Sequence, residues 1–152
     1  MKKISIILIF TAVCFSKTGF SQQASKANNF TGAKATFKNY KALYFINQSD
    51  EKKIKGTLRN IDNALNDPRL KGKLQIELVA FGEGVELFRK NNHYDTLLLK
   101  LQNRGVILAQ CSNTIKEKNI SKDELWPFIS YVPSGNGEII IRQAQGWAII
   151  HP

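Results

Sequence analysis

Short apolar runs alternate with longer amphipathic stretches along most of the chain. The apolar runs are rich in aromatic and branched residues, which is typical of strands buried on both faces of a sheet. On this pattern we expect strands at residues 41–46, 74–81, 106–111, 129–132 and 147–150.

Helical periodicity fills the segments between these runs. After residue 50, Ile54, Leu58 and Ile61 recur at a spacing that places them on one helix face. Ser49 or Asp50 is suited to cap this helix, since short polar side chains accept from the first free amides. The helix is expected to end at residues 66–68, and residues 82–84 to form a loop. Further helices are predicted at residues 85–89, 94–102, 112–118 and 138–145, with a helical turn before residue 126.

This alternation predicts the fold class. Five strands separated by helices favour a single α/β domain, with a mostly parallel sheet covered by helices on both faces. Ligands of such sheets bind beyond the carboxyl ends of the strands. The residues at these ends are Asn47, Gly82, Cys111 and Pro133, so the topology predicts a site among them.

Residues 1–21 follow a different pattern, with two lysines, an apolar run of about a dozen residues and then small residues. This is typical of a secretory signal peptide cleaved after Ser21. The run is shorter than the roughly 20 residues that span a bilayer. We therefore expect a periplasmic or otherwise exported protein with no stable membrane anchor after cleavage. A buried or anchoring N-terminal helix, and a lipoprotein acylated at Cys14, are the alternatives. Residues 22–38 are polar and predict a flexible leader to a domain at residues 39–152.

Composition and charge limit the classes of function. The chain has 152 residues, which suits one domain, and 43% hydrophobic against 22% charged residues argues against wholesale disorder. Cleavage would remove Lys2, Lys3 and Lys17 and no acid, lowering the formal charge from +10 to +7. The remaining cations lie on predicted helix faces and beside turns, with no basic stripe interleaved with aromatics. We therefore expect no nucleic-acid binding.

Cleavage would also remove Cys14 and leave Cys111 as the one cysteine, so an internal disulfide is excluded. An unpaired cysteine in an exported protein is a reactive thiol, a buried thiol or an intermolecular partner. Cys111 stands just before a predicted helix start, where the amides of Asn113 and Thr114 could stabilise a thiolate. Asn113 or Ser112 could cap that helix.

Other chemistry-bearing residues give weaker signals. His93 and His151 are distant from each other and are expected at the surface; together with one cysteine they form no zinc-site pattern. Glu83 and Glu138 lie near the predicted site, where a capping role is expected. The glycines at 82–84 are too closely spaced for a dinucleotide-binding loop. We expect neither a metal nor a cofactor.

Three segments carry a resemblance to a known family. Residues 110–115 (Gln-Cys-Ser-Asn-Thr-Ile), residues 132–135 (Val-Pro-Ser-Gly) and residues 145–148 (Gln-Gly-Trp-Ala) are similar to motifs of the DsrE/DsrF-like family of small sulfur-handling proteins. The resemblance covers roughly residues 40–152. It implies a flavodoxin-like α/β subunit that assembles into homotrimers or homohexamers. It also implies that Cys111 takes the place of the cysteine that carries sulfur as a persulfide.

Two functions remain open. In the first, Cys111 relays sulfane sulfur between a donor and an acceptor, each a protein or a small sulfur compound. In the second, the protein is a non-catalytic oligomer that binds a small ligand or a partner, and Cys111 is structural. Relatives often place a histidine before Gly82, where this chain has Phe81, which removes an acid/base group. The candidate ligand-binding residues around the cysteine are Gly82, Glu83, Ser112, Asn113, Thr114, Pro133, Ser134 and Gly135.

Overall fold

The computed structural model describes residues 29–152. The predicted signal peptide and the first part of the predicted leader lie outside these residues. The chain divides into a unit of residues 1–33 and a unit of residues 34–152, and the second contains all the described helices and strands. None of the described helices is long and apolar enough to cross a membrane.

Five parallel strands form one sheet in the order β4-β3-β2-β1-β5. The two central strands pair over seven residues, from Tyr40 opposite Leu74 to Ile46 opposite Ala80. The two edge strands have three residues each. All five predicted strands are therefore confirmed. Their bounds are β1 (Tyr40–Ile46), β2 (Leu74–Ala80), β3 (Ile107–Cys111), β4 (Ser130–Val132) and β5 (Ala148–Ile150).

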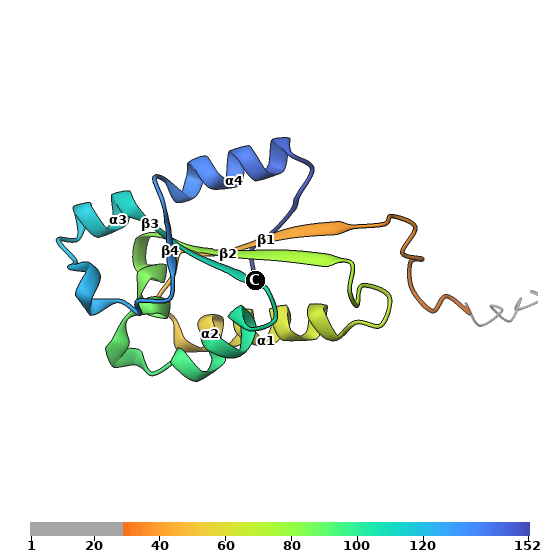
Figure 1. Cartoon of the computed structure of the whole chain (residues 1–152), viewed down its shortest axis with the longest axis horizontal. Helices are drawn as coiled ribbons and strands as arrows, with labels where there is room; N and C mark the ends of the chain where they lie inside the picture. The colour runs from red at the N-terminus through yellow and green to blue at the C-terminus, as the bar shows by residue number, and fades with distance from the viewer. Residues whose placement is uncertain (1–28) are drawn as a thin grey trace, which may run out of the picture. The chain divides into compact units, whose positions relative to one another are not determined.

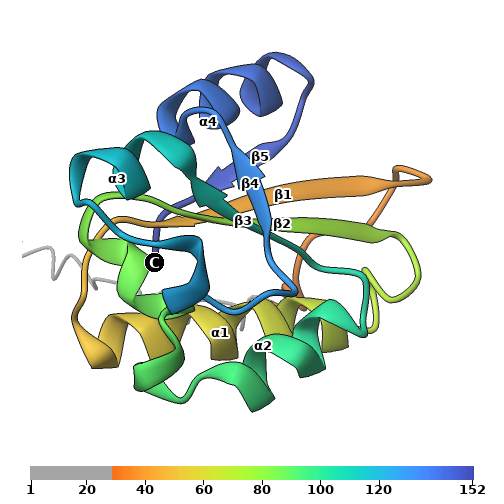
Figure 2. The same cartoon turned by 60° about the vertical axis from the view of Figure 1, so that its left-hand side comes forward.

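Helices cover both faces of the sheet, as the fold class requires (Figure 1). α1 (Glu51–Asn66) and α2 (Asp95–Gln102) lie on one face, and α4 (Gly135–Ala144) lies on the other (Figure 2). This follows from the handedness of parallel connections. The steps from β1 to β2 and β3 run one way along the sheet, whereas the step from β4 to β5 runs back, which puts its helix on the opposite face.

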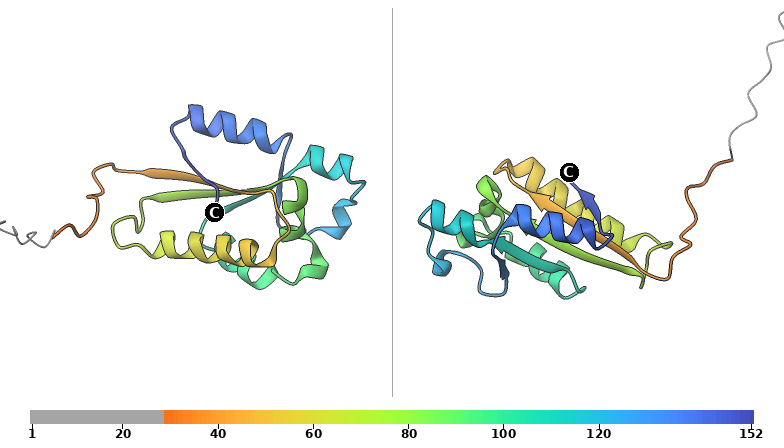
Figure 3. Two further views of the ribbon diagram at one scale, coloured as in Figure 1. Left: turned by 180° about the vertical axis from the view of Figure 1, so that it is seen from behind. Right: turned by 90° about the horizontal axis from the view of Figure 1, so that it is seen from above.

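The carboxyl ends of the strands are bordered by short helical segments. α3 (Ser112–Glu117) follows β3 directly, and the 3-10 segment η1 (Gly82–Phe88) follows β2. α4 also starts at this end and runs back across the sheet (Figure 3). The remaining 3-10 segments are η2 (Lys90–Asn92) and η3 (Lys122–Glu124).

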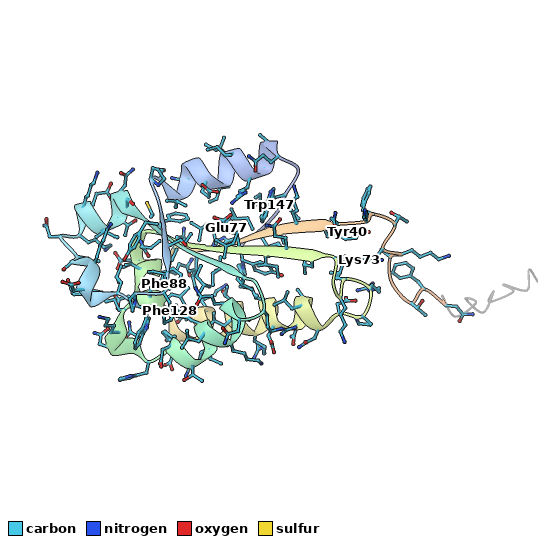
Figure 4. All side chains as sticks on the ribbon, viewed as in Figure 1. Tyr40, Lys73, Glu77, Phe88, Phe128 and Trp147 are labelled. Atoms are coloured by element: carbon cyan, nitrogen blue, oxygen red, sulfur yellow. The ribbon has the colours of Figure 1, made fainter. Side chains whose placement is uncertain are left out.

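Two apolar cores result from these layers. The larger lies between the sheet and α1 and α2, where Ile54, Leu58 and Ile61 are buried as their spacing predicts. Phe88 contributes to this core from η1 (Figure 4). Because successive strand residues face opposite sides, a second, smaller core lies under α4. It contains Leu43, Val79, Ala109 and Trp147.

Capping decides where two helices start, as predicted for α1 and earlier than predicted for α4. The carboxylate of Asp50 accepts from the Lys53 amide at 2.8 Å, so Asp50 caps α1. α4 begins at Gly135, three residues before the predicted start. The Ser134 hydroxyl accepts from the Gly137 amide at 3.2 Å, and this cap offsets the low helix propensity of the glycines in the first turn. The predicted loop at 82–84 is instead the first part of η1.

Candidate functional site

Cys111 is the last residue of β3 and lies at the edge of the sheet where the strands end. Val132 pairs with it on one side. On the other side Ala80 pairs with Gln110, so Phe81 occupies the next position of the register, beside Cys111. The cysteine is a free thiol and only 5% exposed. The site is therefore a largely enclosed sulfur atom with an apolar neighbour on each adjacent strand.

Burial and the neighbouring polar groups act on the pKa of the Cys111 thiol in opposite directions. Burial raises the pKa of the Cys111 thiol, because a thiolate loses solvation there. The backbone and hydroxyl of Thr114 and the amides of Gly135 and Asn113 donate to Sγ and outweigh this effect, so the pKa is lowered. Donors of this kind favour the charged form of the group that accepts them. The charged form of Cys111 is therefore favoured relative to a free cysteine.

The donors come from two helices that start beside the sulfur. Cys111 occupies the N-cap position of α3 with φ −66° and ψ 121°, so the free amides of the first turn are close to its side chain. The amide of Gly135 belongs to α4. A Cβ added to Gly135 would lie 2.7 Å from Cδ1 of Phe81, so only glycine lets α4 approach so closely.

The structure corrects one capping prediction. Neither Asn113 nor Ser112 caps α3, because the N-cap residue is Cys111 and it makes no side-chain capping bond. Ser112 is half-buried as the first residue of the helix, and the Asn113 side chain is exposed.

Two more of the predicted residues follow β4. Pro133 is exposed, and Ser134 is half-buried and caps α4. They contribute to the site by placing the first turn of α4, whose Gly135 amide reaches the sulfur.

Gly82 contributes a backbone hydrogen bond near Cys111. It adopts a left-handed conformation (φ +53°), which favours glycine. Its amide donates to the hydroxyl oxygen of Thr114 at 2.9 Å. The loop after β2 is thereby connected to α3 across 32 residues of sequence, a contact that no sequence pattern indicated.

Glu83 lies apart from the sulfur. It lines a cavity of about 580 Å³ near the start of α1, and Cys111 is not among the residues that line it. Three glutamates border this cavity, and each pairs with a cation: Glu51 with Lys55, Glu83 with Lys118 and Glu86 with Arg89. The glutamates that border this cavity are thus all paired, and the cavity is separate from Cys111.

A buried ion pair under α4 was missed by the sequence analysis. Glu77 is 1% exposed on β2, and its Oε2 accepts from Nε of Arg142 at 2.7 Å. Glu138 shares the same nitrogen at 2.8 Å, and the guanidinium lies 4.4 Å from the ring centroid of Trp147. Glu77 and Trp147 are labelled in this layer in Figure 4. A carboxylate in the middle of a mostly apolar strand was the available signal.

Comparison with known proteins gives one family and several related folds. The family model of the DsrE/DsrF-like family matches residues 41–152. MTH1491 of Methanobacterium thermoautotrophicum, a protein of unknown function, is 32% identical with a TM-score of 0.70, covering 75% of this chain and 100% of that chain. No curated protein gives a significant match.

Two further solved structures share the fold at low identity. BT1422 of Bacteroides thetaiotaomicron is 14% identical with a TM-score of 0.59, covering 74% of this chain and 94% of that chain. The ychN protein of E. coli is 12% identical with a TM-score of 0.54, covering 76% of this chain and 100% of that chain. Both support the α/β architecture and nothing finer.

Proposed function

Because the chain belongs to the DsrE/DsrF-like family, a sulfur-relay-type group, we propose that it carries sulfane sulfur as a persulfide on Cys111. The observation that supports this most strongly is the set of donors around Sγ. The backbone and hydroxyl of Thr114 and the amides of Gly135 and Asn113 lower the pKa of the Cys111 thiol against the opposing effect of burial. An environment that favours a thiolate also favours a persulfide anion, because a persulfide is ionised more readily than a thiol.

The proposed transfer consists of two displacements. The Cys111 thiolate attacks the outer sulfur of a donor persulfide, a new S–S bond forms at Sγ, and the donor leaves as a thiolate with the electron pair of the broken bond. An acceptor thiolate then attacks the same sulfur, and Cys111 leaves as a thiolate. There is no net oxidation. A lowered pKa of Cys111 favours the second step, since thiols of low pKa leave faster.

Phe81 determines how this site can work. Its ring is half-buried and has no group that could donate or accept a proton. Charge on the sulfur must therefore be stabilised by fixed donors, without proton transfer from the end of β2. The reaction we propose needs no such proton, because a thiolate enters and a thiolate leaves in each displacement.

Sulfur loading tests the proposal. Purified protein would be treated with glutathione persulfide and its intact mass measured. We expect wild type to gain the mass of one sulfur atom and to lose it when excess dithiothreitol is added. Cys111→Ser, shown to be folded by circular dichroism, should gain nothing. A wild-type protein that gains no sulfur would overturn the proposal.

A second candidate is a binding protein with a structural cysteine. The observation that favours it is the 5% exposure of Cys111, since buried cysteines commonly behave as small apolar residues. On this account the native thiol resists alkylation, and Cys111→Ser leaves binding of ligand or partner unchanged. The loading experiment separates the two candidates.

We also propose that the protein is exported and forms homotrimers or homohexamers. The assembly follows the family, and α4 offers a surface for it. Ile140 and Ile141 are 67% and 52% exposed, and neighbouring apolar side chains of this size are costly to leave in water. Sedimentation of the mature protein as a monomer would contradict the assembly.

Export predicts a mature N-terminus at Gln22, and N-terminal sequencing of secreted or periplasmic material reads it directly.

A further inference from the structure

Positive charge gathers where the two central strands begin. Residues 29–49 contain three lysines, and residues 68–76 contain two lysines and an arginine; neither segment contains a carboxylate. The fold brings the two segments together, because the amide of Tyr40 donates to the carbonyl oxygen of Lys73 at 2.7 Å. Both residues are labelled at the same end of the sheet in Figure 4. Two basic segments thus share the edge of the sheet where β1 and β2 start.

The lysines at this edge have no carboxylate partner. Within residues 29–152 every ion pair involves other cations. Asp67 and Glu77, which flank the second segment, each pair with an arginine. Lys41 and Lys73 line a cavity of about 260 Å³ between the starts of the two strands. The positive charge is therefore uncompensated, and beside it lies a recess that an anionic group can enter. The exposed lysines concerned are Lys38, Lys41, Lys71 and Lys73.

An aromatic side chain projects beside these lysines. Phe37 is 69% exposed and directly precedes Lys38. Its backbone amide donates to the hydroxyl oxygen of Tyr40 at 2.9 Å, and its ring meets the Tyr40 ring edge-on at 5.7 Å between centroids. One exposed apolar residue is ordinary by itself. A phenylalanine held outward by contacts to the start of β1, next to cations, combines the two features of a segment that lies on a membrane surface.

We propose that Phe37, Lys38, Lys41, Lys71 and Lys73 form a basic edge that binds reversibly to a bilayer containing anionic phospholipids. Each lysine close to such a surface strengthens binding about fivefold, while the apolar ring of Phe37 enters the headgroup region. The cavity between Lys41 and Lys73 can receive a lipid phosphate. This inference goes beyond the proposed function, since it involves neither Cys111 nor sulfur chemistry.

The distribution of charge also determines the orientation of the bound protein. Cys111 lies where β3 ends, at the opposite edge of the sheet from the basic edge. Glu51, Glu83 and Glu86 border the cavity at that opposite edge. An anionic surface attracts the basic edge more than the opposite one. The bound protein therefore presents Cys111 away from the membrane, toward donors and acceptors in solution.

A bilayer fits the basic edge better than a nucleic acid does. Single-stranded nucleic acids bind along grooves where successive bases stack on several aromatic side chains. The basic edge has one outward ring, because the neighbouring Tyr40 is half-buried. Phe37 therefore distinguishes the two partners: insertion into a bilayer needs its apolar ring, whereas attraction to a soluble polyanion needs only the lysines.

Vesicle co-sedimentation tests this inference. Mature protein beginning at residue 22 would be mixed with vesicles of phosphatidylcholine alone, or of phosphatidylcholine and phosphatidylglycerol in equal parts. The salt concentration would be about 0.1 M, where charges farther than ~10 Å from the surface are screened. One variant combines Lys71→Gln with Lys73→Gln, and another is Phe37→Ser. Lys52→Gln with Lys116→Gln is the matched control, because it removes the same charge from exposed positions at the opposite edge. Urea unfolding confirms that each variant is folded.

We expect wild type to bind the vesicles that contain phosphatidylglycerol and not the neutral ones. Replacing Lys71 and Lys73 should weaken binding about tenfold or more, and Phe37→Ser about threefold or more. The control should stay within about twofold of wild type. Wild type that binds no anionic vesicles, or binds both kinds equally, would overturn the inference, and so would an equal loss in the control. Phe37→Ser with wild-type affinity would show a general polyanion site and exclude the bilayer as its specific partner.

Sulfur loading keeps this claim distinct from the proposed function. Cys111→Ser should bind vesicles as wild type does. If wild type takes up sulfur but does not bind anionic vesicles, the role of the basic edge is wrong and the carrier function stands. The reverse result would overturn the carrier function and leave membrane binding intact.

Discussion

Glu77 is the one buried carboxylate among the described residues, and it makes the stability of the protein depend on pH. Burial raises its pKa; Arg142 opposes this effect and Glu138 adds to it. The folded chain therefore holds this proton more strongly than the unfolded chain. Between the unfolded and folded pKa values the folded state binds more protons, so the free energy of unfolding falls as the pH rises.

Glu77→Gln should remove this contribution. Urea unfolding would be measured at several pH values from roughly 4 to 7, the range above the pKa of an unperturbed glutamate. We expect the free energy of unfolding of wild type to fall more steeply with rising pH than that of the variant. The exposed Glu117→Gln is the matched control and should behave as wild type. Parallel pH profiles for wild type and Glu77→Gln would contradict this role.

The sequence predicted some of these residues and not others, for a physical reason. Cys111 could be found because it is a nucleophile at the end of a buried strand, and both properties are local. The pair of Glu77 and Arg142 is separated by 65 residues, and the bond from Gly82 to Thr114 by 32. Such contacts depend on how a helix packs on the sheet, which no local pattern records.

At the scale of elements, the start of α4 controls the site. The amide of its first residue, Gly135, helps to lower the pKa of Cys111, and a Cβ added at that residue would clash with the ring of Phe81. The predicted start at residue 138 is three residues late, because Gly-Asn-Gly is typical of a loop. The Ser134 cap overrides that propensity. The strands were predicted closely because continuous apolar runs reflect burial on both faces.

Gly135→Ala should damage both stability and reactivity. Its Cβ would lie 2.7 Å from Cδ1 of Phe81, and overpacking of this kind costs about 1–3 kcal/mol. Displacement of the amide should also slow Cys111 alkylation at neutral pH. Urea unfolding and alkylation rates measure the two effects.

Gly56→Ala is the matched control for that substitution. Gly56 lies in α1, where an added Cβ meets nothing within 4 Å. Replacing a helical glycine by alanine should therefore raise stability by about 0.5–1 kcal/mol and leave alkylation unchanged. Equal effects of the two substitutions on stability would show that the contact with Phe81 does not constrain α4.

At the scale of the whole molecule, the site depends on the strand order. The alternation of strands and helices predicted a parallel sheet, but it does not specify which strands are neighbours. The chain returns from β4 at one edge to β5 at the other, beside β1, and this step places α4 on the second face. The Gly135 amide thereby adds to the effect of α3 on the pKa of Cys111. Donors from separate elements meet at Cys111 only in the folded protein.

The most direct test of the account is the pH dependence of Cys111 alkylation, measured in the native protein and in the same protein unfolded in urea. In the unfolded chain the thiol has no fixed donors, so its midpoint is the reference. We predict a lower midpoint in the native protein, together with measurable alkylation at neutral pH. A native midpoint at or above the unfolded one, or a native thiol that does not react, would contradict the claim that the fold prepares this sulfur as an anion.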